Sequence, residues 1–283
     1  MSDKSWAIPL MRAGYGGRGV TYLAVAGLSL WAIWRGGEAQ GTNSAIDALS
    51  TSAWGVVILW IIGIGLLAYA IWRGIDATED LEDYGSDGKG LVARAGMVIT
   101  GLIHAALAAT AISAALGGGA SGGEGERSGV SRAVAQLLDM PFGPFLVGIA
   151  ALATLGAGVY YLIKAYKAKY REKLRANHFT TNYDWALRAG VAAQGVVVLV
   201  IGGFIAAAAM AGSSAEAGGI GKVFDWLASQ PFGNFLVILL CLGLLGFAFF
   251  CFVNAAYRIV PKVAGDDLET LGAKLKAKAR AAT

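Results

Sequence analysis

Three arginines, each followed by alanine and glycine, stand at the start of long apolar stretches of the chain. The runs are Arg12-Ala13-Gly14, Arg94-Ala95-Gly96 and Arg188-Ala189-Gly190. Arginine stays charged and offers a planar set of donors that suits phosphate. Two partners are expected: lipid phosphate, or carbonyl groups at helix C-termini, where the helix dipole favours a cation. The helix-end role needs no solute and is favoured.

Two further sets of polar residues recur at equivalent distances. Six residues after the arginines stand Arg18, Thr100 and Gln194. An aromatic-glycine pair occurs as Trp54-Gly55, Phe142-Gly143 and Phe232-Gly233, and twenty-one residues after its glycine stand Asp76, Lys164 and Asn254. Because such groups are costly in lipid, they face a bundle interior, water or headgroups. These residues are candidates for lining a polar vestibule, although snorkelling and hydrogen bonds between helices are the favoured interpretation.

A single histidine, His104, lies ten residues after Arg94 in the middle of an apolar stretch. A histidine near the bilayer midplane is a candidate proton relay or ligand contact. Its equivalents in the other two stretches are Tyr22 and Val198, and its own stretch carries no acid. A packing or hydrogen-bonding role is therefore the favoured prediction.

Catalytic, metal and cofactor motifs are absent from the sequence. The chain has two histidines and two cysteines and no CxxC, HExxH or CxxCH run. Cys241 and Cys251 lie too far apart along one helix to form a disulfide. The glycine runs follow no predicted strand and so indicate no dinucleotide site. We expect no catalytic residue, no metal, no cofactor and no enzymatic activity.

Membrane-spanning helices must position these residues. Of 283 residues, 56% are hydrophobic and only 15% are charged, against about 25% charged residues in soluble domains. A transmembrane helix needs roughly 20 residues, and the first stretch reaches that length only with Arg18 near or inside its boundary. The six charge-free stretches are residues 19–34, 53–72, 95–123, 140–163, 189–215 and 226–257.

The distribution of arginine and lysine predicts the orientation of these spans. The basic residues on one side are only Arg35, Arg127, Arg132 and Lys222, out of 23 in the chain. The positive-inside rule therefore predicts a multi-pass protein of the inner membrane with both termini in the cytoplasm. Residues 1–34 show no clear cleavage site, so the first span is expected to be retained. This uneven distribution indicates topology, and no nucleic-acid binding is expected.

The connections between spans have distinct compositions. The acid-rich segment 76–87 is expected to form a solvated cytoplasmic turn, and Lys164–Arg175 to continue the fourth span as a basic helix. The Gly/Ser-rich segment 117–129 is expected to be a mobile outer loop. The tail 266–280, with Leu268, Leu271 and Leu275 among lysines, is a candidate for lying on the membrane surface. Anionic lipid at the cytoplasmic face is the expected partner of the basic segments.

The recurring runs define a threefold tandem repeat of two spans each. The predicted units are residues 1–80, 81–175 and 176–262, followed by a basic cytoplasmic tail, 263–283. The three Arg-Ala-Gly starts and two Pro-Phe-Gly starts resemble the bacterial domain-of-unknown-function family numbered 1206, over residues 10–260. The first unit departs from that pattern, with Ala53-Trp54-Gly55 in place of Pro-Phe-Gly. The resemblance implies three two-helix membrane repeats and no assigned activity.

The predicted fold is therefore an all-α membrane protein with six transmembrane helices, arranged as three parallel repeats around a pseudo-threefold axis. The favoured function is a non-enzymatic integral membrane protein that binds lipid or a protein partner, which includes a second copy of the chain. The alternative is a channel or transporter for a small solute or anion, with a polar cytoplasmic vestibule. A membrane enzyme that uses His104 is the least favoured class.

Overall fold

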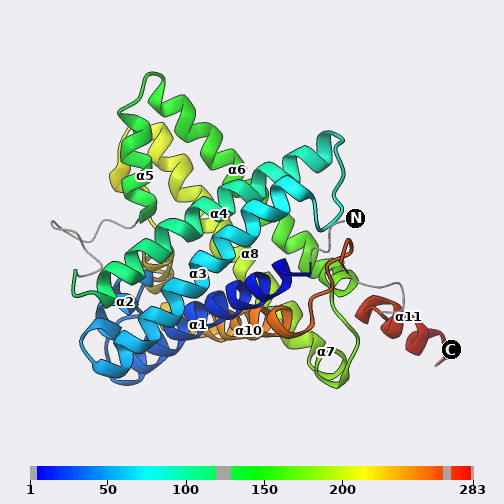
Figure 1. Cartoon of the computed structure of the whole chain (residues 1–283). Coiled ribbons are helices and arrows are strands. Elements are labelled where there is room, and N and C mark those ends of the chain that lie inside the picture. The colour runs from blue at the N-terminus through cyan, green and yellow to red at the C-terminus, as the bar shows by residue number, and fades with distance from the viewer. Residues whose placement is uncertain (1–4, 119–128, 264–268, 282–283) are drawn as a thin grey trace.

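The computed structural model describes residues 5–118, 129–263 and 269–281, so most of the predicted outer loop 117–129 and Leu268 lie outside the described residues. The expected all-α fold is found throughout the described chain, with two isolated β-bridges besides the helices. Six helices are long (Figure 1): α1 (Ala7–Trp34), α3 (Ala53–Glu79), α4 (Gly88–Ala115), α6 (Gly143–Tyr166), α8 (Asp184–Ala211) and α10 (Gly233–Tyr257).

Five of the long helices are long and apolar enough to cross a membrane, namely α3, α4, α6, α8 and α10. Helix α1 has 28 residues, as many as α4 and α8, but does not belong to this group. Arg12 and Arg18 lie within α1 and lower its mean hydropathy. The described chain is thus consistent with a multi-pass membrane protein.

The long helices are neighbours in the order α4, α3, α1, α10, α8, α6. Figure 1 shows α4 lying along α3, and α6 lying along α8. Helices α4 and α6 stand at the two ends of this order and do not pack against each other. Small residues allow the close approaches within it: Gly17 meets the backbone of Gly65, and Gly190 meets that of Gly246. Such contacts bring helices close enough to gain van der Waals energy in lipid.

Three short helices precede α3, α6 and α10. They are α2 (Thr42–Ser50), α5 (Gly129–Leu138) and α9 (Ile220–Ala228). The glycine of each aromatic-glycine pair lies against a backbone carbonyl at the end of the short helix, where a Cβ atom would collide with it. The aromatic residue beside that glycine is exposed in all three cases. The recurring pair is therefore a tight corner with an outward aromatic side chain, of the kind that anchors membrane interfaces.

One sequence prediction about the connections is wrong, and the structure limits a second. Residues 164–175 do not continue α6 as a basic helix, because α6 ends at Tyr166 and a 3-10 turn, η1 (Lys169–Lys173), follows. The tail helix α11 (Leu271–Ala281) is docked on the protein: Leu271 is fully buried and its amide donates to the carbonyl of Leu174 at 2.8 Å. The short helix α7 (His178–Asn182) leads into α8. Leu271 therefore packs against the chain and does not face a membrane, whereas the membrane-surface location of the rest of the tail stays a prediction.

Candidate functional site

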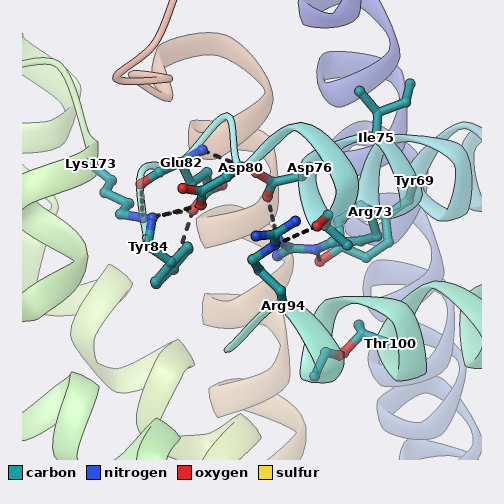
Figure 2. A network of polar contacts seen from close by, with 12 residues as sticks. Tyr69, Arg73, Ile75, Asp76, Asp80, Glu82, Tyr84, Arg94, Thr100 and Lys173 are labelled. Carbon is teal, nitrogen blue, oxygen red and sulfur yellow. Dashed lines mark hydrogen bonds and ion pairs between the residues drawn. The ribbon is translucent and has the colours of Figure 1, made fainter. Parts of the chain in front are cut away.

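A buried carboxylate, that of Glu82, joins three segments that are far apart in the sequence. Glu82 lies in the connection between α3 and α4 and is 2% exposed. Its Oε1 accepts hydrogen bonds from Nε and Nη2 of Arg258, at 2.9 and 2.5 Å, and its Oε2 accepts from Nζ of Lys173 at 2.8 Å. Figure 2 shows Lys173 reaching Glu82 from a separate segment. One side chain thus ties together the ends of α3, η1 and α10.

Asp76 and Asn254, predicted as equivalent positions, both belong to this network. Oδ1 of Asp76 accepts from the Glu82 amide at 3.1 Å, and its Oδ2 pairs with Nη1 of Arg73 at 3.3 Å. Oδ1 of Asn254 accepts from Nη1 of Arg258 at 2.7 Å. Both Asp76 and Asn254 are fully buried. The structure therefore brings two of the three predicted positions to one polar cluster, which we call the Glu82 network.

The positive charges around Glu82 decide its ionisation. Burial by itself would raise the pKa of this carboxyl, but Arg258, Arg73 and Lys173 outweigh that effect and hold the pKa well below its ordinary value of 4.5. Burial, together with the nearby Glu82 charge, raises the pKa of Tyr84 to about 12. Glu82 is therefore ionised at neutral pH and Tyr84 is a neutral phenol, which donates to Glu82 at 3.4 Å.

The prediction that residues 76–87 form a solvated turn holds for part of the segment, where Asp83, Ser86 and Asp87 are exposed, and is wrong for the rest. Asp76, Asp80, Leu81 and Glu82 are all buried. Oδ1 and Oδ2 of Asp80 accept from the amides of Tyr84 and Gly85, at 2.8 and 3.0 Å. Asp80 also pairs with Lys262 at 3.2 Å. Each buried carboxylate has a cation or backbone donors, so the segment folds inward where its composition alone indicated solvent.

A second polar cluster lies on α1 and α3. The hydroxyl oxygen of Tyr69, which is fully buried, accepts from two guanidinium groups: Nη1 of Arg18 and Nε of Arg73, each at 2.9 Å. Arg73 also donates to the Tyr15 hydroxyl at 3.4 Å. Two arginines therefore converge on one phenol oxygen, and Asp76 is the carboxylate partner of Arg73 alone.

Arg18 is buried without a carboxylate partner. It is 5% exposed, and within the described chain it forms no ion pair. Its Nε has no hydrogen-bond partner. The guanidinium carbon lies 4.6 Å from the ring centroid of Tyr69 and 5.5 Å from that of Phe247. Aromatic faces attract a cation but leave its hydrogen-bonding capacity unused.

Two other predicted residues also lack polar partners among the residues described. Lys164, half-buried on α6, has its Nζ 5.9 Å from the Tyr161 ring centroid and 5.6 Å from that of Phe250, and forms no ion pair. Gln194, on α8, is 7% exposed, and its Oε1 has no hydrogen-bond partner. A buried polar group without a partner costs free energy and calls for an explanation.

Two of the three repeated arginines bind helix C-termini. Arg94 donates from Nε to the Ala77 carbonyl at 2.6 Å and from Nη2 to Thr78 at 3.1 Å, at the end of α3. Arg188 donates in the same way to the last carbonyls of α6, at 3.0 Å for each bond. Arg12 is exposed and makes no such bond to any described residue. The expected helix-end role thus applies to Arg94 and Arg188, and Arg12 departs from it.

His104 and Thr100 lie on α4, and both bond to their own helix. Nδ1 of His104 donates to the Thr100 carbonyl at 2.7 Å, since a carbonyl accepts only, and the imidazole lies 4.7 Å from the Tyr69 ring. Thr100 donates to the Gly96 carbonyl at 2.7 Å, and Figure 2 shows it apart from the Glu82 network. The contacts of His104 are those of a packed, hydrogen-bonded residue.

Sequence reasoning missed the central residues of both clusters: Glu82, Arg258, Lys173, Arg73, Tyr69 and Tyr15. Glu82 carried no repeat signal, because the other units have no equivalent acid, and its partner Arg258 is 176 residues away. Tyr69 and Arg73 stand four residues apart on α3, a spacing that places them on one helix face. That spacing was the one local signal available.

A comparison with known protein families identifies the family of the chain. The family described as Domain of Unknown Function (DUF1206) matches the chain in three segments, residues 13–79, 95–168 and 189–258. The chain belongs to this family. Each DUF1206 segment begins directly after one of the repeated arginines and contains two long helices, α1 and α3, α4 and α6, or α8 and α10. The resemblance inferred from the repeated runs is confirmed.

This DUF1206 chain is also similar to a bacterial protein of undefined role. It is 26% identical over 259 residues to "Uncharacterized protein YxxB" of Bacillus subtilis (strain 168), which covers 90% of this chain and 92% of the relative. No solved structure matches the chain.

Proposed function

We propose that the chain is a six-span protein of the bacterial inner membrane with both termini in the cytoplasm. The three DUF1206 segments each contain two long helices, which supports a transmembrane role for α1 beside the five more apolar helices. In a ring of three repeats around a pseudo-threefold axis, six neighbouring pairs of helices would pack together. Five of those pairs do pack, and the pair α4 and α6 is the exception.

The function that the geometry supports best is non-enzymatic binding of anionic lipid at the cytoplasmic face. The observation that carries it is an excess of buried positive charge around the two polar clusters. Five basic side chains are buried or half-buried there, Arg18, Arg73, Lys164, Lys173 and Arg258, against three buried carboxylates, Asp76, Asp80 and Glu82, and in the described chain Arg18 and Lys164 pair with none of them. Uncompensated charge inside a membrane protein is costly. An anionic headgroup would supply the missing negative charge.

The alternative is an anion channel or transporter, which the same positive charges would favour. Aromatic side chains pack together beside Arg18: Tyr22 lies 4.8 Å from Phe247, and Phe250 stacks on Phe247 at 5.6 Å. Two open surface pockets among the described residues lie elsewhere, one beside Phe179 and Phe252 and one beside Phe232. The aromatic packing beside Arg18 supports lipid binding over conduction.

Thermal unfolding in detergent micelles that contain phosphatidylglycerol or phosphatidylcholine tests this function. A ligand present at about a hundredfold excess over its Kd stabilises the folded state by about 2.7 kcal/mol. We therefore expect phosphatidylglycerol to raise the Tm by roughly 5–10 °C relative to phosphatidylcholine. Equal Tm values in the two lipids would refute anionic-lipid binding. Chloride or phosphate flux into proteoliposomes would favour the transporter instead.

A further inference from the structure

The second repeat keeps the glycines of a close helix contact but does not make the contact. In the first and third repeats, the glycine two residues after the repeated arginine meets the second long helix: Gly14 meets the backbone of Tyr69, and Gly190 meets that of Gly246. In the second repeat Gly96 is the equivalent of Gly190. Gly156 is the equivalent of Gly246, because each stands thirteen residues after the glycine of a Pro-Phe-Gly run. A Cβ atom added at Gly96 or Gly156 would meet nothing within 4 Å.

The helix order leads to the same conclusion, since α4 and α6 do not pack together. The second repeat therefore leaves α4 and α6 without the close contact of the other two repeats, and the surroundings of both glycines are open. We call the space between these two helices the opening.

Each of the two unpacked helices contributes a ring that contacts an aromatic neighbour of Arg18. On one side, His104 of α4 packs on Tyr69 with ring centroids 4.7 Å apart, and Tyr69 accepts a hydrogen bond from Arg18. On the other side, Tyr161 of α6 lies 6.3 Å from Phe247, whose ring centroid is 5.5 Å from the Arg18 guanidinium. Both unpacked helices therefore contact the aromatic residues that surround the buried guanidinium group.

Two cations in this region lack an anionic partner among the described residues. Arg18 is 95% buried, given its 5% exposure, and its Nε is unpartnered. Lys164 forms no ion pair, and its Nζ lies 5.6 Å from the ring centroid of Phe250, which stacks on the Phe247 ring beside Arg18. A phosphate oxygen that approached from the opening would accept charge-assisted hydrogen bonds from these groups, and such bonds are about twice as strong as neutral ones.

We propose that an anionic phospholipid occupies the opening, with its phosphate at Arg18 and Lys164 and an acyl chain between α4 and α6. The inference rests on the lipid-binding function proposed above and specifies its site and route. Two properties of the opening identify the occupant. The apolar faces of α4 and α6 suit an acyl chain, and the unpaired cations suit an anionic headgroup. Arginine suits the phosphate because its planar donors can bind two oxygens at once.

Native mass spectrometry of the full chain tests the site. The protein is incubated in detergent with phosphatidylglycerol, phosphatidylcholine or inorganic phosphate, and the bound molecules are counted. We expect retention of phosphatidylglycerol alone. Arg18→Gln and Lys164→Gln should each weaken it about tenfold, which corresponds to about 1.4 kcal/mol.

A variant that fills the opening tests the route independently of the charges. Gly96→Trp with Gly156→Trp adds bulk where nothing lies within 4 Å, so folding should be retained while phosphatidylglycerol retention falls about tenfold. The matched control is Gly203→Trp, at an exposed glycine of α8 with equally open surroundings, which should retain lipid as the unmodified chain does. If Arg18→Gln fails to fold, phosphatidylglycerol retention by Lys164→Gln and by the double tryptophan variant still tests the site.

Two results would overturn the inference. Equal lipid retention by the double tryptophan variant and Gly203→Trp would exclude the route between α4 and α6. Displacement of the lipid by inorganic phosphate would identify a free anion as the occupant. If phosphatidylglycerol still raised the Tm of every variant equally, this site would be wrong while the general lipid-binding function stood. If it raised no Tm above that in phosphatidylcholine, the function itself would fail.

Discussion

At the residue scale, the charge of Glu82 governs the arrangement of three chain segments. Arg258 is 6% exposed at its side chain and Glu82 is fully buried, so each would be an unpaired charge without the other. A buried ion pair contributes little net stability by comparison with apolar packing, but removal of one partner is strongly destabilising. The network is therefore most sensitive to the loss of its single carboxylate.

Glu82→Gln should destabilise the protein strongly. It leaves Arg258 and Lys173 without a counter-charge, and the expected loss is about 3–5 kcal/mol. The measurement is the Tm in detergent micelles. Asp83→Asn is the matched control, because the Asp83 side chain is 68% exposed, and its Tm should be nearly unchanged. Equal Tm values for the two variants would contradict the central role of Glu82.

The same carboxylate predicts an acid dependence of stability. Because the folded pKa of Glu82 lies well below its ordinary 4.5, the unfolded chain binds more protons at this position between the two values. The contribution of Glu82 is therefore fully present above pH 4.5 and is lost as pH falls further towards the folded pKa. The Tm difference between the unmodified chain and Glu82→Gln should narrow below that pH. A constant difference would show that Glu82 is not a paired carboxylate.

At the element scale, helix ends are joined by the repeated arginines. Arg94 links α4 to the end of α3, and Arg188 links α8 to the end of α6, so each arginine joins consecutive repeats. A cation at a helix C-terminus satisfies carbonyls that have no partner within the helix and interacts favourably with the dipole. Each of these arginines binds the end of the last long helix of the preceding repeat. If the three repeats closed into a ring, Arg12 would bind the end of α10, where Arg258 and Asn254 already interact.

Arg94→Gln and Arg188→Gln should each lower stability by about 1–2 kcal/mol through the loss of two charged hydrogen bonds. Arg12→Gln, at an exposed residue without such bonds, should change it by less than about 0.5 kcal/mol. Thermal unfolding of the three single variants in one detergent provides the comparison. An equal loss in all three would show that Arg12 also binds a helix end.

The helices and the repeat could be predicted from the sequence because long apolar runs and repeated glycines are local patterns. The aromatic-glycine pairs recur in the sequence, and in the structure each lies at the corner between a short helix and the long helix that follows it. The partner of Glu82 could not be predicted, because Arg258 is distant in the chain and the acidic segment looks soluble by composition. The opening between α4 and α6 could not be predicted either. Gly96 and Gly156 give the second repeat the same small residues as the closed third repeat.

At the scale of the whole molecule, the Glu82 network and the beginning of α1 lie at one end of the bundle. Ala7 and Met11 of α1 pack in one core cluster with Leu81 and Val260. The corners that precede α3, α6 and α10 lie at the opposite ends of those helices. With the basic residues concentrated near the network, this polarity predicts that the Glu82 network faces the cytoplasm.

Cysteine labelling in intact cells checks this orientation. Cys241 and Cys251 are buried and free, so a background with both replaced by alanine gives a silent reference. A membrane-impermeant maleimide should label Thr51→Cys, an exposed residue before α3, and should not label Ser86→Cys, an exposed residue beside the network. Labelling of Ser86→Cys alone would reverse the topology.

The most direct test of the central claim, that unpaired buried cations hold an anionic lipid, is a crystal structure grown in a lipidic phase with phosphatidylglycerol. The account predicts a phosphate within hydrogen-bonding distance of Arg18 and Lys164, with an acyl chain separating Gly96 from Gly156. A structure in which α4 and α6 close directly on each other, with Arg18 still lacking an anionic partner, would contradict it.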